Sequence, residues 1–224
     1  MKQIEIKKDI LSAHEMIACE NRKLFNKKGI FVLNLMSSPG AGKTTLLERT
    51  IELLKNNFNL GVIEGDVATS YDAERISAHG IKAVQINTGG ACHLESTMIK
   101  NAMAEFATER LDVLIIENVG NLVCPAEFDL GEDAKIMILS VTEGEDKPLK
   151  YPLMFRLSKA LIINKVDLLP YIDCSTERII QDVRSINPDL KVFETSCTKK
   201  TGLNGWKEWL QEEINKKKHS LKNV

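Results

Sequence analysis

The chain has little of what marks a nucleic-acid-binding, membrane or secreted protein. Its 224 residues carry 30 Lys+Arg against 31 Asp+Glu, and a formal charge of -1 gives no excess of positive potential for a phosphate backbone. No apolar run approaches the roughly 20 residues that span a bilayer. The lysine-rich start, residues 1–9, leads into a charged helical stretch where a signal peptide would have an apolar core. We therefore expect no nucleic-acid partner, no membrane partner and a cytoplasmic location.

Cysteine and aromatic residues are also scarce. Aromatic residues make up 5% of the chain, and the cysteines form an odd set of five without a CxxC pair: Cys19, Cys92, Cys124, Cys174 and Cys197. In a reducing compartment such a set indicates free thiols or metal ligands, and it argues against disulfides. The 43% hydrophobic and 27% charged residues are typical of an ordinary globular protein, which excludes disorder and coiled coils.

Short β-branched runs alternate with amphipathic stretches, which predicts an α/β fold with helices on both faces of a mostly parallel sheet. Seven strands are expected, each buried on both faces, at residues 30–36, 60–65, 81–87, 111–118, 134–141, 159–164 and 191–195. Helices are expected at 43–57, 71–79, 94–109, 175–186 and 203–218. An N-terminal helix is predicted from the spacing of Ile10, Ile17, Leu24 and Phe25.

A glycine-rich loop follows the first predicted strand and opens a helix, which is the setting of a Walker A phosphate loop. Ser37 replaces the first glycine of the motif, while the remaining glycines let backbone N–H groups turn toward phosphate oxygens. Lys43 is expected to contact the β- and γ-phosphates, and the Thr44 hydroxyl to coordinate Mg²⁺. The predicted nucleotide-binding residues here are Ser38, Pro39, Gly40, Ala41, Gly42, Lys43, Thr44 and Thr45. The chain therefore divides into an N-terminal helical extension (1–28), a three-layer P-loop domain (29–218) and a basic tail (219–224).

A second motif follows the sixth predicted strand and favours guanine over adenine. Asn164, Lys165 and Asp167 resemble the NKxD element of GTP-binding proteins. A carboxylate such as Asp167 can accept from both donors of the guanine edge, where adenine presents an acceptor. Ser196 and Cys197 follow the last strand and look like the loop whose backbone contacts the guanine carbonyl oxygen, although a plain surface turn is an equal alternative.

Two acidic residues end predicted strands near the phosphate loop. Asp66 and Glu117 supply the hard oxygen ligands that Mg²⁺ prefers, alongside Thr44. Gly120, in an ExxG pattern after Glu117, offers an N–H that can sense a γ-phosphate. With Lys43, these residues form the predicted catalytic set. The alternative is that both acids cap helices or pair with lysines.

Two short segments supply a candidate site for a softer metal. Cys92 and His93 follow the third predicted strand, and Cys124 lies four residues after Gly120. Thiolates with an imidazole suit Zn²⁺ or Ni²⁺. Three ligands fall short of a closed structural site, so the site is either open or completed by a second subunit, and both arrangements favour metal transfer.

Four segments together resemble one family. Residues 34–45, 64–66, 88–94 and 117–125 read NLMSSPGAGKTT, EGD, TGGACHL and ENVGNLVCP. They resemble HypB, a family of GTPases that assist nickel insertion into nickel-iron hydrogenases, and the similarity spans essentially the whole chain. The resemblance implies a GTP-dependent homodimer of the dimerising (SIMIBI) P-loop class, with nickel or zinc held at the subunit interface by Cys92, His93 and Cys124. It also implies a nickel chaperone, HypA, as partner, which can meet the N-terminal helix, and the hydrogenase large subunit as final acceptor.

Other functions fit less well. A urease-type accessory GTPase, UreG, carries a Cys-Pro-His motif, whereas here Cys92 is followed directly by His93. A small kinase needs an arginine-bearing lid, and residues 143–156 are too short and arginine-poor for one. A nucleotide-dependent binding module with incidental hydrolysis stays open. Slow hydrolysis is expected because no glutamine or arginine finger appears at a recognisable spacing. Only His14 and Cys19 stand in the N-terminal region where some relatives carry extra nickel ligands.

Overall fold

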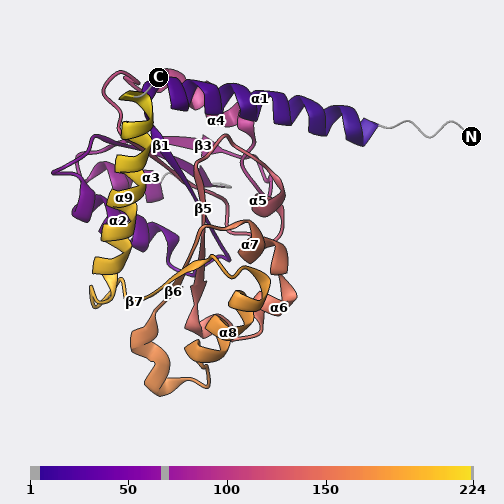
Figure 1. The fold of residues 1–224 in the computed structure, drawn as a ribbon, viewed down its shortest axis with the longest axis vertical. Coiled ribbons are helices and arrows are strands. Elements are labelled where there is room, and N and C mark those ends of the chain that lie inside the picture. The colour runs from indigo at the N-terminus through magenta and orange to yellow at the C-terminus, as the bar shows by residue number, and fades with distance from the viewer. Residues whose placement is uncertain (1–5, 67–70, 223–224) are drawn as a thin grey trace, which may run out of the picture.

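The computed structural model describes residues 6–66 and 71–222 (Figure 1). Its centre is one sheet of seven parallel strands in the order β3-β2-β4-β1-β5-β6-β7, which confirms the predicted α/β class. The strands are β1 (Phe31–Ser37), β2 (Leu60–Asp66), β3 (Lys82–Asn87), β4 (Val113–Glu117), β5 (Ala134–Ser140), β6 (Ala160–Asn164) and β7 (Lys191–Thr195). The strand that precedes the phosphate loop, β1, therefore lies at the centre, between β4 and β5.

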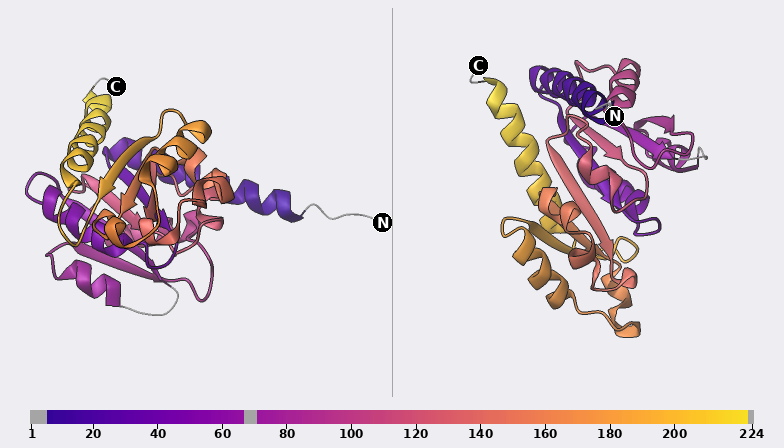
Figure 2. Two further views of the ribbon diagram at one scale, coloured as in Figure 1. Left: turned by 90° about the horizontal axis from the view of Figure 1, so that it is seen from below. Right: turned by 90° about the vertical axis from the view of Figure 1, so that its right-hand side faces the viewer.

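Helices cover both faces and make three layers (Figure 2). The α-helices are α1 (Ile6–Lys28), α2 (Lys43–Leu54), α3 (Tyr71–Ser77), α4 (Ser96–Ala102), α5 (Cys124–Glu127), α6 (Lys147–Lys150), α7 (Pro152–Leu157), α8 (Thr176–Ile186) and α9 (Leu203–Lys222). Apolar residues of α2 and α9 pack on one face of the sheet, with Trp206 fully buried among them. The other face is covered by α1 and α4 over one half and by α5, α7 and α8 over the other.

The two edge strands differ from the expectation that every strand is buried on both faces. Residues of β3 and β7 are mostly half-buried or exposed, because each strand lies at an edge of the sheet and pairs with a single neighbour. The helix expected at 94–109 is also shorter, since α4 ends at Ala102 and a 3₁₀ turn covers Met103–Glu105. Phe106 then takes an extended backbone and packs its ring against Gly61, where a Cβ would lie 2.7 Å from it.

The predicted N-terminal helix is confirmed as α1, which begins at Ile6 and ends at Lys28. Its C-terminal half is anchored to the body, because the Asn21 amide donates to the carbonyls of Ser96 (2.9 Å) and Leu130 (3.1 Å), and Phe25 is fully buried. The N-terminal half projects beyond the sheet (Figures 1 and 2). The side chain of Ile10 lies outside the described residues.

The basic tail expected at 219–224 begins inside α9, which continues to Lys222. Among the helices of the described ranges, none combines the length and apolar character that crossing a bilayer requires.

Candidate functional site

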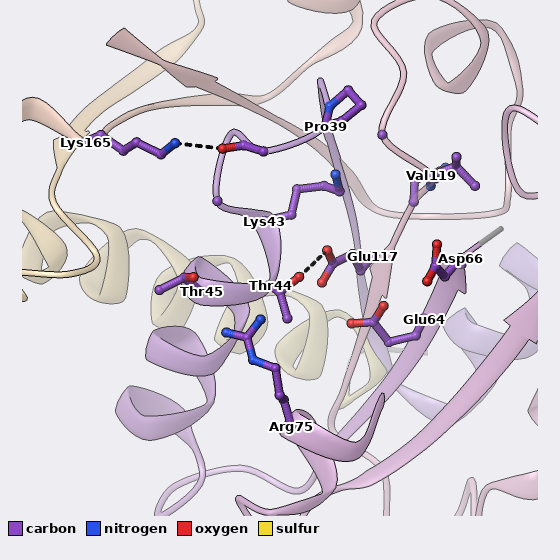
Figure 3. A pocket seen from close by; sticks show the side chains of 15 residues that line it. Pro39, Lys43, Thr44, Thr45, Glu64, Asp66, Arg75, Glu117, Val119 and Lys165 are labelled. Atoms are coloured by element: carbon purple, nitrogen blue, oxygen red, sulfur yellow. Dashed lines mark hydrogen bonds between the residues drawn. The ribbon is translucent and has the colours of Figure 1, made fainter. Parts of the chain in front are cut away.

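A cleft of about 620 Å³ opens where β1, β2 and β4 end (Figure 3). It is lined by the phosphate loop, by the acidic strand ends and by the segment after β4. The lining residues are Pro39, Gly40, Gly42, Lys43, Thr44, Thr45, Glu64, Gly65, Asp66, Arg75, Glu117, Asn118, Val119, Gly120 and Lys165. The carboxyl ends of parallel strands are where α/β sheets bind ligands. The cleft therefore brings most of the predicted phosphate-loop and Mg²⁺ residues together.

The phosphate loop has the backbone that its glycines predict. Gly40 and Gly42 both have positive φ, +76° and +101°, and Gly42 directly precedes α2. The Lys43 ammonium donates to the Ser37 hydroxyl at 3.0 Å. Ser37, which stands where the motif has its first glycine, thus holds the lysine side chain at the mouth of the loop. The Ser38 hydroxyl donates to Glu143, and neither Ser38 nor Ala41 lines the cleft.

The NKxD element is attached to the phosphate loop. The Asn164 amide donates to the Ala41 carbonyl at 3.0 Å, and its oxygen accepts from the Thr195 hydroxyl (3.3 Å). A Cβ on Gly42 would lie 2.5 Å from that amide nitrogen, so only glycine fits there. Lys165, at φ +63°, donates to the Gly40 carbonyl at 2.7 Å. Asn164 therefore ties the loop to neighbouring backbone, as its chemistry predicts.

The predicted base-reading residues lie beyond the part of the cleft described above. Asp167 lies in the first turn of a 3₁₀ segment, Val166–Tyr171, and does not line the cleft. Ser196 and Cys197 are buried, which does not fit a plain surface turn, and burial raises the pKa of the Cys197 thiol to about 11. The Cys197 N–H donates to Asn164 Oδ1 at 3.4 Å. A thiol with its pKa raised in this way stays protonated at neutral pH.

Three acidic side chains gather at the ends of β2 and β4. The Thr44 hydroxyl donates to Glu117 at 2.9 Å, and Asp66 ends β2 (Figure 3). Glu64, which the sequence analysis did not select, lies beside Glu117 in register on the neighbouring strand, and both are almost fully buried. The feature of the sequence that could have identified Glu64 is a carboxylate inside an otherwise apolar strand. Oxygen donors of this kind fit Mg²⁺.

An arginine also lines the cleft, although no spacing in the sequence pointed to it. Arg75, on α3, pairs with Glu48 at 2.8 Å and lines the cleft together with Thr44 (Figure 3). On the opposite side, Gly120 lies against the phosphate loop, because a Cβ there would be 3.0 Å from Pro39. The ExxG segment is thus in direct contact with the phosphate loop.

The three predicted ligands of the softer metal lie together. Their ligand atoms are within 4.8 Å of one another, in a group that joins the loop after β3 to the start of α5. Cys92 Sγ lies 3.0 Å from Cys124 Sγ and 3.4 Å from His93 Nδ1. Asn121 holds the two segments together, since its amide donates to the Cys92 carbonyl at 3.3 Å and its oxygen accepts from the Val123 N–H at 2.8 Å.

When no metal is bound, the surroundings favour a neutral imidazole at His93 and a protonated thiol at Cys124. The His93 ring stacks on Phe128 at 3.7 Å between centroids, and burial lowers the pKa of His93. The contact with Cys92, together with burial, raises the pKa of Cys124. A metal bound through Cys124 would therefore displace its thiol proton. Phe128 was missed by the sequence analysis, because its contact with His93 is tertiary.

The cleft and the thiol-imidazole group define a class: a P-loop nucleotide-binding protein with a candidate metal site beside the ExxG segment. The model for the CobW/HypB/UreG nucleotide-binding domain matches residues 31–194. The chain is 51% identical to the hydrogenase maturation factor HypB of Azotobacter vinelandii, over 95% of this chain and 70% of that protein. It belongs to the HypB family of hydrogenase maturation factors.

Two solved structures share the fold closely. HypB from Helicobacter pylori, in complex with nickel, superposes with a TM-score of 0.86 at 41% identity and covers 91% of this chain and 96% of that chain. HypB from Archaeoglobus fulgidus gives a TM-score of 0.86 at 39% identity and covers 91% and 100%. The family resemblance inferred from the four motifs is confirmed.

Proposed function

We propose that this protein is a GTP-hydrolysing metallochaperone that binds nickel and delivers it during the maturation of nickel-iron hydrogenases. One observation carries the proposal. The segment from Glu117 to Cys124 lines the nucleotide cleft at one end and supplies a metal ligand at the other. A protein that moves this segment when it hydrolyses nucleotide also moves a thiolate. The Helicobacter pylori relative, solved with nickel, supports the choice of metal.

The nucleotide is GTP, bound through its phosphates and its base. The Asp167 carboxylate accepts from the guanine edge, and the backbone of Ser196 and Cys197 closes the base pocket. The phosphate-loop N–H groups and Lys43 balance the charge that develops on the transferred phosphoryl group. Thr44, Asp66 and Glu117 would hold Mg²⁺, which supplies further neutralisation of that charge when bound. The Gly120 N–H reads the γ-phosphate, and water is the acceptor in a slow reaction.

The cargo is Ni²⁺ or Zn²⁺, held by Cys92, His93 and Cys124. Three ligands leave a position open for exchange, and a second copy of the chain can approach it in a GTP-dependent homodimer. A HypA-like nickel chaperone and the hydrogenase large subunit are the proposed partners, with α1 among the surfaces that the chaperone meets. A cytoplasmic setting suits the five free thiols.

The test is size-exclusion chromatography with light scattering on the apo, GDP and non-hydrolysable GTP forms, each with and without one equivalent of nickel, followed by metal analysis. We expect the GTP-analogue form to elute as a dimer that retains nickel. Cys92→Ala and Cys124→Ala should lose the metal, while Cys19→Ala, an exposed cysteine on α1, should keep it. A protein that stays monomeric and metal-free throughout would contradict nickel delivery and leave only nucleotide binding.

A further inference from the structure

One buried side-chain oxygen joins the nucleotide cleft to the loop that carries Cys92 and His93. Asn118 Oδ1 accepts hydrogen bonds from two backbone N–H groups, Val119 at 3.0 Å and Leu94 at 3.0 Å. Val119 precedes Gly120 in the cleft wall, and Leu94 directly follows His93. Two segments 24 residues apart in sequence therefore share one acceptor.

Leu94 makes a second contact with the cleft through its side chain. It is fully buried, and a Cβ on Gly65 would lie 2.7 Å from it. Gly65 stands between Glu64 and Asp66, the acidic residues at the end of β2. Leu94 thus contacts two segments that line the cleft: its N–H donates to Asn118, and its side chain packs against Gly65 of β2. A displacement of β2 or of the segment at Asn118 would therefore also displace Leu94, the residue next to His93.

Asn118 is held so that its oxygen cannot turn away freely. Its backbone N–H donates to the Leu35 carbonyl of β1 at 3.0 Å, and its amide donates to Asn34 Oδ1 at 3.1 Å. The Asn34 amide in turn donates to Glu132 at 3.2 Å. Asn118 and Asn34 are essentially inaccessible to solvent. In such a site an unmade hydrogen bond costs far more than at the surface, so the Leu94 N–H follows the Asn118 oxygen.

We propose that Asn118 is a positioning residue that transmits the state of the nucleotide cleft to the Cys92–His93 half of the metal site through the Leu94 N–H. This inference rests on the proposed function, because it assigns the route by which that function couples its two sites. The backbone from Gly120 to Cys124 already connects the cleft to one ligand. Asn118 connects the cleft to the other two ligands, Cys92 and His93. The positions of all three ligands therefore depend on the short segment from Asn118 to Cys124.

Hydrogen exchange of the peptide that covers residues 91–98 tests the connection without any metal. With saturating nucleotide, we expect exchange in this peptide to differ between the GDP and GTP-analogue forms of the wild-type protein. In Asn118→Ala the difference should disappear, because the Leu94 N–H has lost its acceptor. Asn118→Asp keeps an acceptor oxygen and should retain the difference. Asn187→Ala is the control, since it removes an amide that donates to the Phe155 and Ser158 carbonyls and leaves both Asn118 and its partner Asn34 unchanged.

A nickel titration on the same variants then measures the coupling. The ratio of the nickel Kd values in the GDP and GTP-analogue forms is expected at about 5- to 150-fold in the wild type. It should be lower in Asn118→Ala, which loses the route to Cys92 and His93 but keeps the backbone route to Cys124. Identical exchange in the two nucleotide forms of the wild type, or an unchanged difference in Asn118→Ala, would overturn the inference. If the exchange difference follows Asn118 but the wild type binds no nickel, the connection stands and the proposed cargo is wrong.

Discussion

Lys135 gives the sharpest test of how α5, the helix that begins at the candidate metal ligand Cys124, is held. Its ammonium, at the start of β5, donates to the carbonyls of Pro125 (3.2 Å) and Ala126 (2.6 Å) within α5 and of Phe128 (2.9 Å) just after it. It also lies 3.6 Å from Glu132 Oε1. The Lys135 side chain is 12% exposed and that of Glu132 only 3%, so solvent screens these interactions weakly.

We expect Lys135→Met to lower the free energy of unfolding by about 3–5 kcal/mol at pH 8, the usual cost of removing one partner of a buried charge pair. The loss should depend on pH. Burial already raises the pKa of Glu132, and removing the neighbouring cation raises it further. A carboxyl whose pKa is raised by folding contributes stability below its unfolded pKa and loses it as pH rises through the folded pKa. The deficit should therefore be smaller at pH 5 than at pH 8.

Urea unfolding at the two pH values measures this deficit, and a nickel titration shows whether the position of Cys124 has changed. Lys216→Met is the control, because Lys216 pairs with Glu213 on the exposed face of α9 with 67% of its side chain accessible. An exposed pair of this kind is worth at most about 1 kcal/mol. A Lys135→Met deficit below about 1 kcal/mol at pH 8, or an equal deficit at pH 5, would refute the reasoning.

Three further predictions concern other parts of the molecule. Asp167→Asn should weaken GTP binding about 100-fold, through lost charge-assisted hydrogen bonds, and shift preference to xanthosine nucleotides; unchanged GTP affinity in a fluorescent-nucleotide titration would contradict the base assignment. Gly131→Ala, at φ +94° with its Cβ 2.8 Å from the Ala18 carbonyl, should loosen α1, which limited proteolysis at residues 13–28 would detect against a resistant wild type. Trp206→Ala should cost about 3–5 kcal/mol in urea unfolding, because Trp206 is fully buried, whereas a cost near zero would show that the α9 interface is dispensable.

The sequence analysis succeeded where short segments carry their own signal. The phosphate loop, the NKxD element and the central strands each have a local pattern, so the α/β class and the residues around Lys43 and Asn164 followed from it. The metal group also followed, because chemistry selects cysteine and histidine even when 31 residues separate His93 from Cys124. The fold itself was needed to show that these ligand atoms meet.

What the sequence could not show were contacts between segments. Glu64 and Arg75 enter the cleft, and Phe128 stacks on His93, only because particular strands and helices become neighbours. The burial of the edge strands β3 and β7 was mispredicted for a similar reason, since the strand order that exposes them is a property of the whole sheet. The short helices α5, α6 and α7 span too few residues to display a helical period.

The bond from Asn164 to the Ala41 carbonyl bears on how the protein folds. It joins residues 123 apart in sequence, so the phosphate loop acquires its final shape only after β6 has taken its place beside β5. Contacts of such separation form late, because the intervening chain must first be closed. A nucleotide therefore recognises the completed fold and not its precursors. Its binding energy will lengthen the lifetime of the native state by slowing unfolding and will do little to hasten folding.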